Sequence, residues 1–304
     1  MNLVILSDPH YRNNTRRSYI RDGISSWLYE QIAITKTIFD YAVAAKATVI
    51  VNGDIFNSKN RIDVGLYNTV WKLYEGYSEV LSITINTGNH DLITLSRDSA
   101  LRPFSGICSI VDEPAWVNPY DLRVVPYGMY KESSGDILFC HEDIAGLSIG
   151  GIISRSALLP EMFSGWNKVF NGHIHNPQTL GNIINIGSIM AQNWGEAGNK
   201  NRFLHLTDSG IKSIPIDCPQ FIEGNYVEGD KRNFYRVKTS DLGDPVFKNF
   251  NVTPIREEKK EARKVRLSDN ISIEEEMSGY IALKNKTLEK DKLLITGKHL
   301  IKGE

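Results

Sequence analysis

Short apolar runs that end abruptly in polar residues recur through the first half of the chain. Runs of this length, without alternation of apolar and polar positions, are typical of strands buried on both faces of a parallel sheet. The runs are residues 3–6, 49–51, 81–85, 137–139 and 169–170. We therefore predict five buried strands.

Apolar residues at helical spacing lie between some of these runs. Residues 28–42 and 66–77 carry apolar side chains three or four positions apart, which predicts one helix in each segment. Strand and helix then alternate, which predicts an α/β fold with at least partly parallel strands. After Gly181, short runs between Gly, Asn and Asp turn signals predict antiparallel strands at 183–186, 203–206 and 211–216.

Composition divides the chain into two parts. With 304 residues and 41% hydrophobic content, the chain can form one large core and a smaller appendage. Charged side chains number 39 among residues 1–219 and 32 among residues 220–304, so their density roughly doubles after Pro219. We predict a main domain at 1–219 and a small module at 220–304.

Net charge and cysteine content narrow the class of protein. A formal net charge of -1 gives no overall basic field, so contact with nucleic acid requires local clusters of cations. Three widely spaced cysteines without a CxxC pattern fit neither a disulfide framework nor a thiolate zinc site. No apolar run approaches the ~18 residues of a membrane span, and the N-terminus lacks a signal-peptide pattern. We expect a cytoplasmic protein with no membrane segment.

Residues with metal-binding side chains follow the predicted strands. Loops at the carboxyl ends of strands in an α/β sheet converge on one crevice, so residues distant in sequence meet there. Five of the seven histidines lie in these loops. The loop residues are Asp8, His10, Asp54, Asn89, His90, Asp91, His141, His173 and His175.

The donor types in these loops indicate which ions the site would bind. Imidazoles, carboxylates and one amide oxygen, without thiolate, suit Mn, Fe or Zn and suit Ca poorly. Each motif alone is more often a turn or a satisfied structural residue. Together they exceed the needs of one ion, because the pairs Asp8/His10 and His173/His175 each bring two side chains to one loop. We predict two divalent ions, Mn first, with Fe, Mg or Zn as alternatives.

The order of these motifs resembles that of the calcineurin-like metallophosphoesterase superfamily: D-x-H, G-D, G-N-H-[DE], a lone H and G-H-x-H, spread over residues 8–175. The resemblance implies an α+β sandwich of two mixed β-sheets flanked by helices, followed by a small C-terminal capping and partner-binding module. It also implies roles for the motif residues. Asp8, His10 and His175 would hold one metal, Asn89, His141 and His173 the other, and Asp54 would bridge them.

The resemblance further implies that His90 faces the substrate and stabilises or protonates the leaving oxygen. Related nucleases often carry His or Asp three residues after the bridging Asp, where this chain has Asn57. A neutral amide can orient an imidazole but cannot stabilise its cation as a carboxylate does. We therefore predict that Asn57 or Asp91 orients His90 and name all three as candidate catalytic residues.

Segments around the motifs resemble the SbcD-type nuclease subunits of DNA repair and recombination, including short phage-encoded versions. The segments are GDIFN, VDEPAWV, VVPYG, NGHIHNPQ and NIGSIMAQNWGEAGNKNRFLHL. In contrast, the G-D-x-x-D-R-G motif of phosphoprotein phosphatases is absent from the sequence. The resemblance implies a Mn-dependent DNA exonuclease, with endonuclease activity as a further expectation, acting with an SbcC-like SMC-type ATPase in a bacterial or phage-infected cell.

The sequence gives a weaker indication of the residues that contact the substrate. Cations and one aromatic ring that follow the Asp8 and Asp54 loops could bind phosphates and stack on a base: Tyr11, Arg12, Arg16, Arg17, Lys59 and Arg61. A solvated loop is the alternative for this set. Residues 256–266 form a linker or a docking segment for the ATPase. The helix at 66–77 is one candidate face for a homodimer, with ordinary core packing as its alternative.

Two other functions stay open. A small-molecule or cyclic-nucleotide phosphodiesterase would share the whole metal set and would differ in the capping module. A non-catalytic scaffold for an ATPase would use its metals structurally. Since every ligand position of the motifs is filled, the sequence does not suggest a degenerate site.

Overall fold

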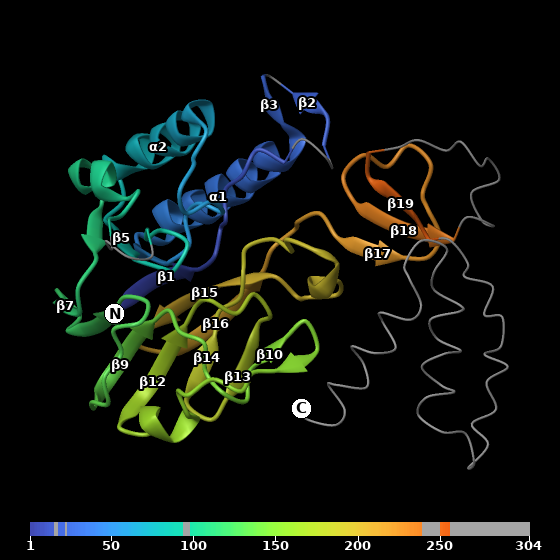
Figure 1. Ribbon diagram of the computed structural model, residues 1–304. Coiled ribbons are helices and arrows are strands. Elements are labelled where there is room, and N and C mark those ends of the chain that lie inside the picture. The colour runs from blue at the N-terminus through green and yellow to red at the C-terminus, as the bar shows by residue number, and fades with distance from the viewer. Residues whose placement is uncertain (15–17, 22, 94–97, 239–249, 256–304) are drawn as a thin grey trace, which may run out of the picture. The chain divides into compact units, whose positions relative to one another are not determined.

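Two six-stranded mixed sheets form the body of the computed structural model (Figure 1). The structure describes residues 1–14, 18–21, 23–93, 98–238 and 250–255. The first sheet has the order β16 (Gly210–Pro215), β15 (Arg202–Thr207), β1 (Asn2–Leu6), β4 (Thr48–Asn52), β5 (Ile83–Asn86), β6 (Ser109–Val111). The second has the order β13 (Gln178–Leu180), β14 (Ile183–Asn185), β12 (Trp166–Asn171), β9 (Gly135–Cys140), β8 (Leu122–Val125), β7 (Ala115–Val117).

The centre of each sheet is parallel and its edges include antiparallel strands. β1, β4, β5 and β6 run parallel, while β15 pairs antiparallel with both β1 and β16. In the second sheet β14, β12, β9 and β8 run parallel, with β13 and β7 antiparallel at the edges. The five strands predicted as buried are confirmed, and they are divided between the two sheets. The run at 183–186 was expected to be antiparallel, but β14 is antiparallel only to β13.

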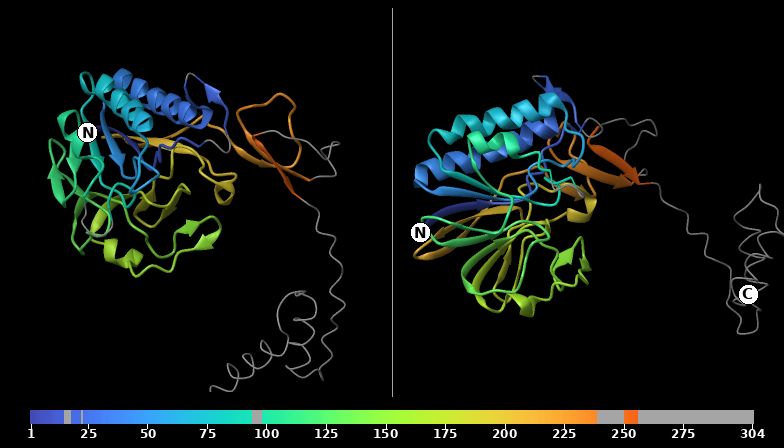
Figure 2. Two further views of the ribbon diagram at one scale, coloured as in Figure 1. Left: turned by 45° about the horizontal axis from the view of Figure 1, so that its top comes forward. Right: turned by 60° about the vertical axis from the view of Figure 1, so that its left-hand side comes forward.

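The two sheets pack face to face (Figure 2). Apolar side chains of alternate residues fill the space between them. Leu3, Ile5 and Ile50 of the first sheet meet Phe139 and Phe170 of the second, and all five are fully buried. Residues one position along each strand point to the opposite face. The core between the sheets therefore fixes which side chains reach each outer face.

Both α-helices of the described residues cover the outer face of the first sheet. α1 (Ser26–Ala45) begins at Ser25, whose hydroxyl accepts the Leu28 N–H, and ends at Lys46 in the left-handed conformation. α2 (Val64–Ser78) begins at Asp63 in the same way. Their apolar faces pack on β1, β4 and β5 in one cluster. The predicted α/β sandwich is confirmed, but helices flank it on one side.

Loops and short helical turns cover the outer face of the second sheet. They include η2 (Pro160–Phe163), whose Phe163 belongs to the apolar cluster on that face. A hairpin of β10 (Ser148–Ile149) and β11 (Ile152–Ile153) contacts the edge strand β13 through hydrogen bonds between Ser148 and Gln178. Two further short segments are a hairpin before α1, β2 (Ile20–Arg21) and β3 (Ile24–Ser25), and the turn η1 (Arg102–Gly106). Within the described ranges, no helix is long and apolar enough to cross a membrane.

Beyond Pro219, three parallel strands form a small sheet: β17 (Phe221–Glu223), β18 (Phe234–Lys238) and β19 (Val252–Ile255). Phe221 and Phe234 belong to the same apolar cluster as Trp27 of α1. The domain boundary after Pro219 remains a prediction. The docking segment at 256–266 and the rest of the C-terminal region lie outside the described residues.

The aromatic face of α2 packs partly in the core. Leu66, Val70, Leu73 and Tyr74 are buried in the core, and Tyr74 packs edge to face against Phe39 of α1 at 5.4 Å between ring centroids. This arrangement favours ordinary packing for the buried part of the face. Homodimer formation stays an untested prediction.

Candidate metal centre

Loops that follow five strands of the two sheets bring the motif residues together. Asp8 and His10 follow β1, Asp54 follows β4, Asn89 and His90 follow β5, His141 follows β9, and His173 and His175 follow β12. Three overlapping groups of ligand atoms lie within 4.8 Å of one another: Asp8, His10 and His175; His10, Asp54 and His90; Asp54, His141 and His173. The strand ends of both sheets therefore build one polar centre.

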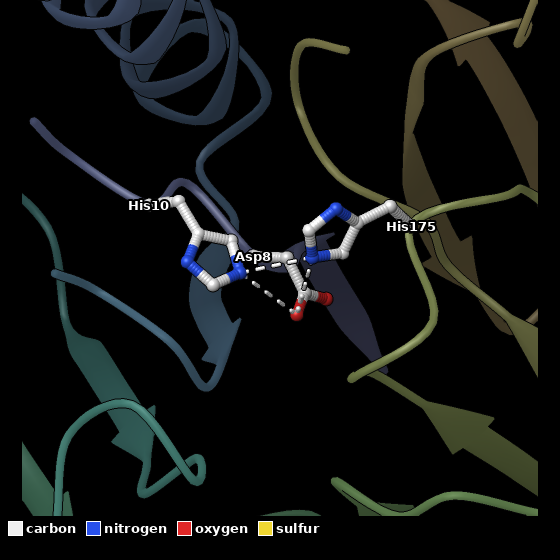
Figure 3. A group of neighbouring side chains, drawn as sticks. All are labelled: Asp8, His10 and His175. Atoms are coloured by element: carbon white, nitrogen blue, oxygen red, sulfur yellow. Dashed lines mark hydrogen bonds and ion pairs between the residues drawn. The ribbon is translucent and has the colours of Figure 1, made fainter. Parts of the chain in front are cut away.

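The first group gathers Asp8, His10 and His175 (Figure 3). Nε2 of His10 and Nε2 of His175 face each other at 2.9 Å, and they lie 3.8 and 4.0 Å from Oδ1 of Asp8. Two imidazole nitrogens at this distance need a cation or a shared proton between them, because two lone pairs repel. The carboxylate beside them favours positive charge at the same point.

Asp54 joins the first group to the third, which holds Asp54, His141 and His173. Its Oδ2 lies 3.4 Å from Nε2 of His10 and 3.4 Å from Nε2 of His141. Nδ1 of His173, in this third group, lies 2.9 Å from Oδ1 of Asn89. The structure thus brings the other six expected ligands together around Asp54, which lies between the two sets.

The hydrogen bonding of His141 indicates whether the residues of this centre fit a metal ion. Nδ1 of His141 donates to the carbonyl of Asn52 at 2.7 Å, so the lone pair must be on Nε2 in the neutral ring. That Nε2 is fully buried and has no hydrogen-bond partner among the described residues. Buried polar atoms are rarely left without a partner. A metal ion would satisfy it, and the residues present fit one.

Electrostatics keep two of the imidazoles neutral. Burial lowers the pKa of His10 well below its usual value and lowers the pKa of His173 to about 4. For His141, burial also acts to lower the pKa, but the charges of Asp54 and Asp8 raise it to about 10. Neutral imidazole is the form that binds metals, so an ion that binds here would displace a proton from His141.

The backbone of the ligand loops is strained. Asp8, His10, Asp54 and His173 have φ values of 52°, 45°, 57° and 73°, in the left-handed region that non-glycine residues rarely adopt. Such residues cost about 1 to 3 kcal/mol each and cluster at functional sites. Four of the six described non-glycine residues with positive φ are candidate ligands. Strain at this centre therefore supports a functional role.

Two motif glycines permit the close approach of the loops. A Cβ on Gly88 would lie 2.2 Å from Oδ1 of Asp54, and a Cβ on Gly172 would lie 2.6 Å from Nδ1 of His141. Any side chain at either position would overlap a candidate ligand. The G-N-H and G-H-x-H motifs therefore need glycine at these positions, because the space beside each one is filled by a candidate ligand.

Four buried asparagines at strand ends, missed in the sequence, brace the ligand loops. Asn52, Asn86, Asn171 and Asn185 are all fully buried. Nδ2 of Asn52 donates across to the Cys140 carbonyl of the second sheet at 2.8 Å, and Asn86 Nδ2 donates to Oδ1 of Asn52 at 2.9 Å. Asn171 Nδ2 donates to Oδ1 of Asn185 at 3.0 Å. The sequence feature that could have identified them is an asparagine at the end of an apolar run, just before a motif.

Substituting Asn52 should destabilise the fold. Asn52→Ala removes the bonds to Cys140 and Asn86 and leaves their buried polar atoms short of partners, which should lower the free energy of unfolding by about 2 to 4 kcal/mol. Chemical denaturation measures the change. Asn167→Ala is the matched control, because Asn167 is an exposed strand residue with one bond to Asp136. Equal midpoints for the two variants would contradict the bracing role.

His90 is held at the rim of the centre by main-chain contacts. Its Nδ1 donates to the carbonyl oxygen of Asn57 at 2.7 Å, and its backbone N–H donates to Oδ1 of Asp54 at 2.7 Å. The ring is half-buried and lies edge to face with His10 at 4.7 Å between centroids. Asn57 thus contacts His90 through its backbone and not through the amide side chain that we expected to act.

Asp91 supports the loops and not the His90 ring. Its carboxylate accepts the backbone N–H groups of Asp54, Gly88 and Ile55 at 2.8, 2.9 and 2.9 Å. Burial, together with the charge of Asp54, raises the pKa of Asp91 to about 7. The residue joins the loop after β5 to the loop after β4, so its place in the structure is that of a brace. A catalytic role for Asp91 or for the Asn57 side chain has no support in these contacts.

The predicted substrate residues divide into several cases. Tyr11 is a correction, because its ring is fully buried and its hydroxyl hydrogen bonds to Thr35, so it cannot stack on a base. The guanidinium of Arg12 lies 4.4 Å over the Trp27 ring and donates to the Gln192 carbonyl. Lys59 is half-buried and Arg61 exposed in the loop after Asp54. Arg16 and Arg17 lie outside the described residues.

The position of Tyr11 leads to a modest prediction. Tyr11→Phe removes one buried hydrogen bond and should lower the free energy of unfolding by about 1 kcal/mol. It should leave hydrolysis unchanged, because the ring does not reach the centre's surface. Parallel denaturation and rate measurements on the purified variant test both statements. A large rise in KM or a large fall in kcat, without a change in stability, would restore Tyr11 as a substrate residue.

Comparisons with known proteins add little to this geometry. No family model matches the chain, and no curated protein matches it. Among solved structures, the chain is similar to the nuclease MPE of Pseudomonas putida at 13% identity, with 66% of this chain and 83% of that chain covered and a TM-score of 0.34. A likeness this weak supports no conclusion about function, so the functional inference depends on the site.

Proposed function

We propose that the chain is a metal-dependent phosphodiesterase of the metallophosphoesterase type that cleaves DNA. One observation carries the proposal: seven metal-binding side chains from five strand ends, Asp54 among them, meet in one centre, on a strained backbone and with a buried nitrogen of His141 that has no hydrogen-bond partner among the described residues. Two ions held by the sets Asp8/His10/His175 and Asn89/His141/His173 would share Asp54. Mn is the ion we propose, with Fe, Mg or Zn as alternatives.

The residues of the centre divide the chemistry among them. Bound ions would supply activation of water and neutralisation of charge on the phosphoryl group. Asp54 fixes the His90 main chain, and Asn57 fixes the tautomer of its ring. With the proton on Nδ1 engaged, Nε2 of His90 is the atom that can exchange a proton with the leaving oxygen.

DNA as substrate and an ATPase as partner are further parts of the proposal. They are supported by the likeness of the flanking segments to SbcD-type nuclease subunits, with repair or recombination in the cytoplasm as the setting. Exonuclease activity is proposed first and endonuclease activity second. The half-buried Lys59 and the exposed Arg61, which follow Asp54 in its loop, are two described cations that could contact the phosphate backbone.

Chelation and re-addition of metal test the phosphodiesterase class. The purified chain should hydrolyse a small aryl phosphodiester in Mn, lose the activity in excess chelator and regain it when Mn is restored. A phosphomonoester serves as the comparison substrate. Activity that persists without metal, or no hydrolysis of any diester, would contradict the proposal.

A further inference from the structure

Glu196 contacts the metal-ligand candidate His175 from the side away from the centre. Oε1 of Glu196 lies 2.8 Å from Nδ1 of His175, and the carboxylate is buried, with 7% of the residue exposed. The residue lies in the turn η3 (Trp194–Glu196), which follows the last predicted ligand along the chain. Neither the motifs nor the mechanism above assigns it a role.

The other partners of Glu196 fix the direction of this hydrogen bond. The backbone N–H of Gln192 donates to Oε2 at 2.7 Å, and Nδ2 of Asn193 donates to Oε1 at 2.6 Å. Both partners can only donate. A carboxylate can only accept, so His175 must donate through Nδ1 as well. The neutral ring then carries its lone pair on Nε2, the atom that faces Asp8 and His10.

The turn that carries Glu196 is anchored on both sides. The Trp194 ring packs edge to face on Phe221 of β17 at 4.9 Å between centroids, and the Arg236 guanidinium of β18 lies 4.3 Å over the same ring. Gln192 is held through its carbonyl by Arg12 at 2.7 Å. The carboxylate is therefore fixed in place before any ion binds.

We propose that Glu196 is a positioning residue of the metal centre, which sets the tautomer and orientation of His175 so that Nε2 ligates one ion. A carboxylate behind a metal-bound histidine also raises the basicity of the ligating nitrogen. The inference rests on the metal centre of the proposed function. It concerns ion binding alone and does not depend on the substrate.

An isosteric substitution separates positioning from packing. Glu196→Gln keeps size and shape but turns an NH₂ group toward either Gln192 N–H or His175 Nδ1–H, where only an acceptor fits. Titration calorimetry with Mn should show that one class of site loses about 10- to 100-fold in affinity while the other stays within about twofold. Glu113→Gln, at an exposed glutamate, is the matched control and should bind Mn like the wild type.

The tautomer of His175 can also be measured directly in the wild-type protein. In the zinc-loaded wild-type protein, nitrogen NMR should show His175 with its proton on Nδ1 and zinc on Nε2. A proton on Nε2, or unchanged Mn affinities in Glu196→Gln, would overturn the inference. A chain that shows the Glu196 effect but hydrolyses no phosphodiester would contradict the proposed function and leave this inference standing.

Discussion

Asp54→Ala should abolish binding of at least one ion and lower phosphodiester hydrolysis by about a thousandfold or more, since metal charge stabilisation supplies several kcal/mol and each 1.36 kcal/mol is tenfold. Asp54 approaches both ligand groups through Oδ2, which lies 3.4 Å from Nε2 of His10 and of His141. Asp8 lies farther from the same two nitrogens, with Oδ1 at 3.8 and 3.7 Å. Its other oxygen holds the His90 main chain. Removing it therefore disconnects three motifs at once.

Calorimetry with Mn and initial rates on a small diester measure the effect of Asp54→Ala. Asp98→Ala is the matched control, because Asp98 is an exposed carboxylate whose described ion pair is with Arg102. The control should keep wild-type metal binding and rate. An Asp54→Ala protein that binds the same number of ions and hydrolyses within tenfold of the wild type would contradict a bridging role.

His90→Ala should lower kcat by about 10²- to 10⁴-fold, the usual contribution of a positioned acid or base, and leave metal stoichiometry unchanged. The reason is that Nδ1 is engaged by the Asn57 carbonyl, which leaves Nε2 to serve the leaving group. His90 also belongs to a group with His10 and Asp54 that could hold an ion. Loss of one ion in His90→Ala would therefore assign it as a ligand and refute the acid role.

Asn57→Ala is the control that the geometry offers for His90. Because His90 is held by the backbone carbonyl of Asn57, an alanine at this position can make the same bond. The variant should retain wild-type activity and metal binding. A large fall in kcat in Asn57→Ala would show that the amide side chain acts in catalysis, as the sequence alone suggested.

The strands and helices were predictable because their local patterns agree with the fold. Buried runs such as residues 3–6 and the capped helix α1 have the periodicity that their surroundings require. The division of the strands between two packed sheets was not readable from periodicity, because a run buried in either sheet has the same pattern. The edge strand β7 was missed because Ala115–Val117 is short and half-exposed.

The ligand set was visible in the sequence, whereas its support was not. Metal-binding residue types directly after predicted strands indicate a metal site in the sequence itself, since few other roles need five histidines in such loops. Hydrogen bonds such as Asn52 to Cys140 or Glu196 to His175 join residues far apart in the chain. Tyr11 was misread because its neighbours in the sequence are polar, whereas its side chain turns inward and its hydroxyl bonds to Thr35.

The proposed nuclease activity is tested by cleavage of end-labelled double-stranded and single-stranded DNA by the purified chain in Mn, beside a cyclic nucleotide and with His90→Ala as control. We expect DNA degradation that requires metal and falls by orders of magnitude in His90→Ala. Hydrolysis of the cyclic nucleotide alone, with DNA left intact even after a candidate SMC-type ATPase is added, would rule out DNA as the substrate and assign the centre to small-molecule phosphodiesters.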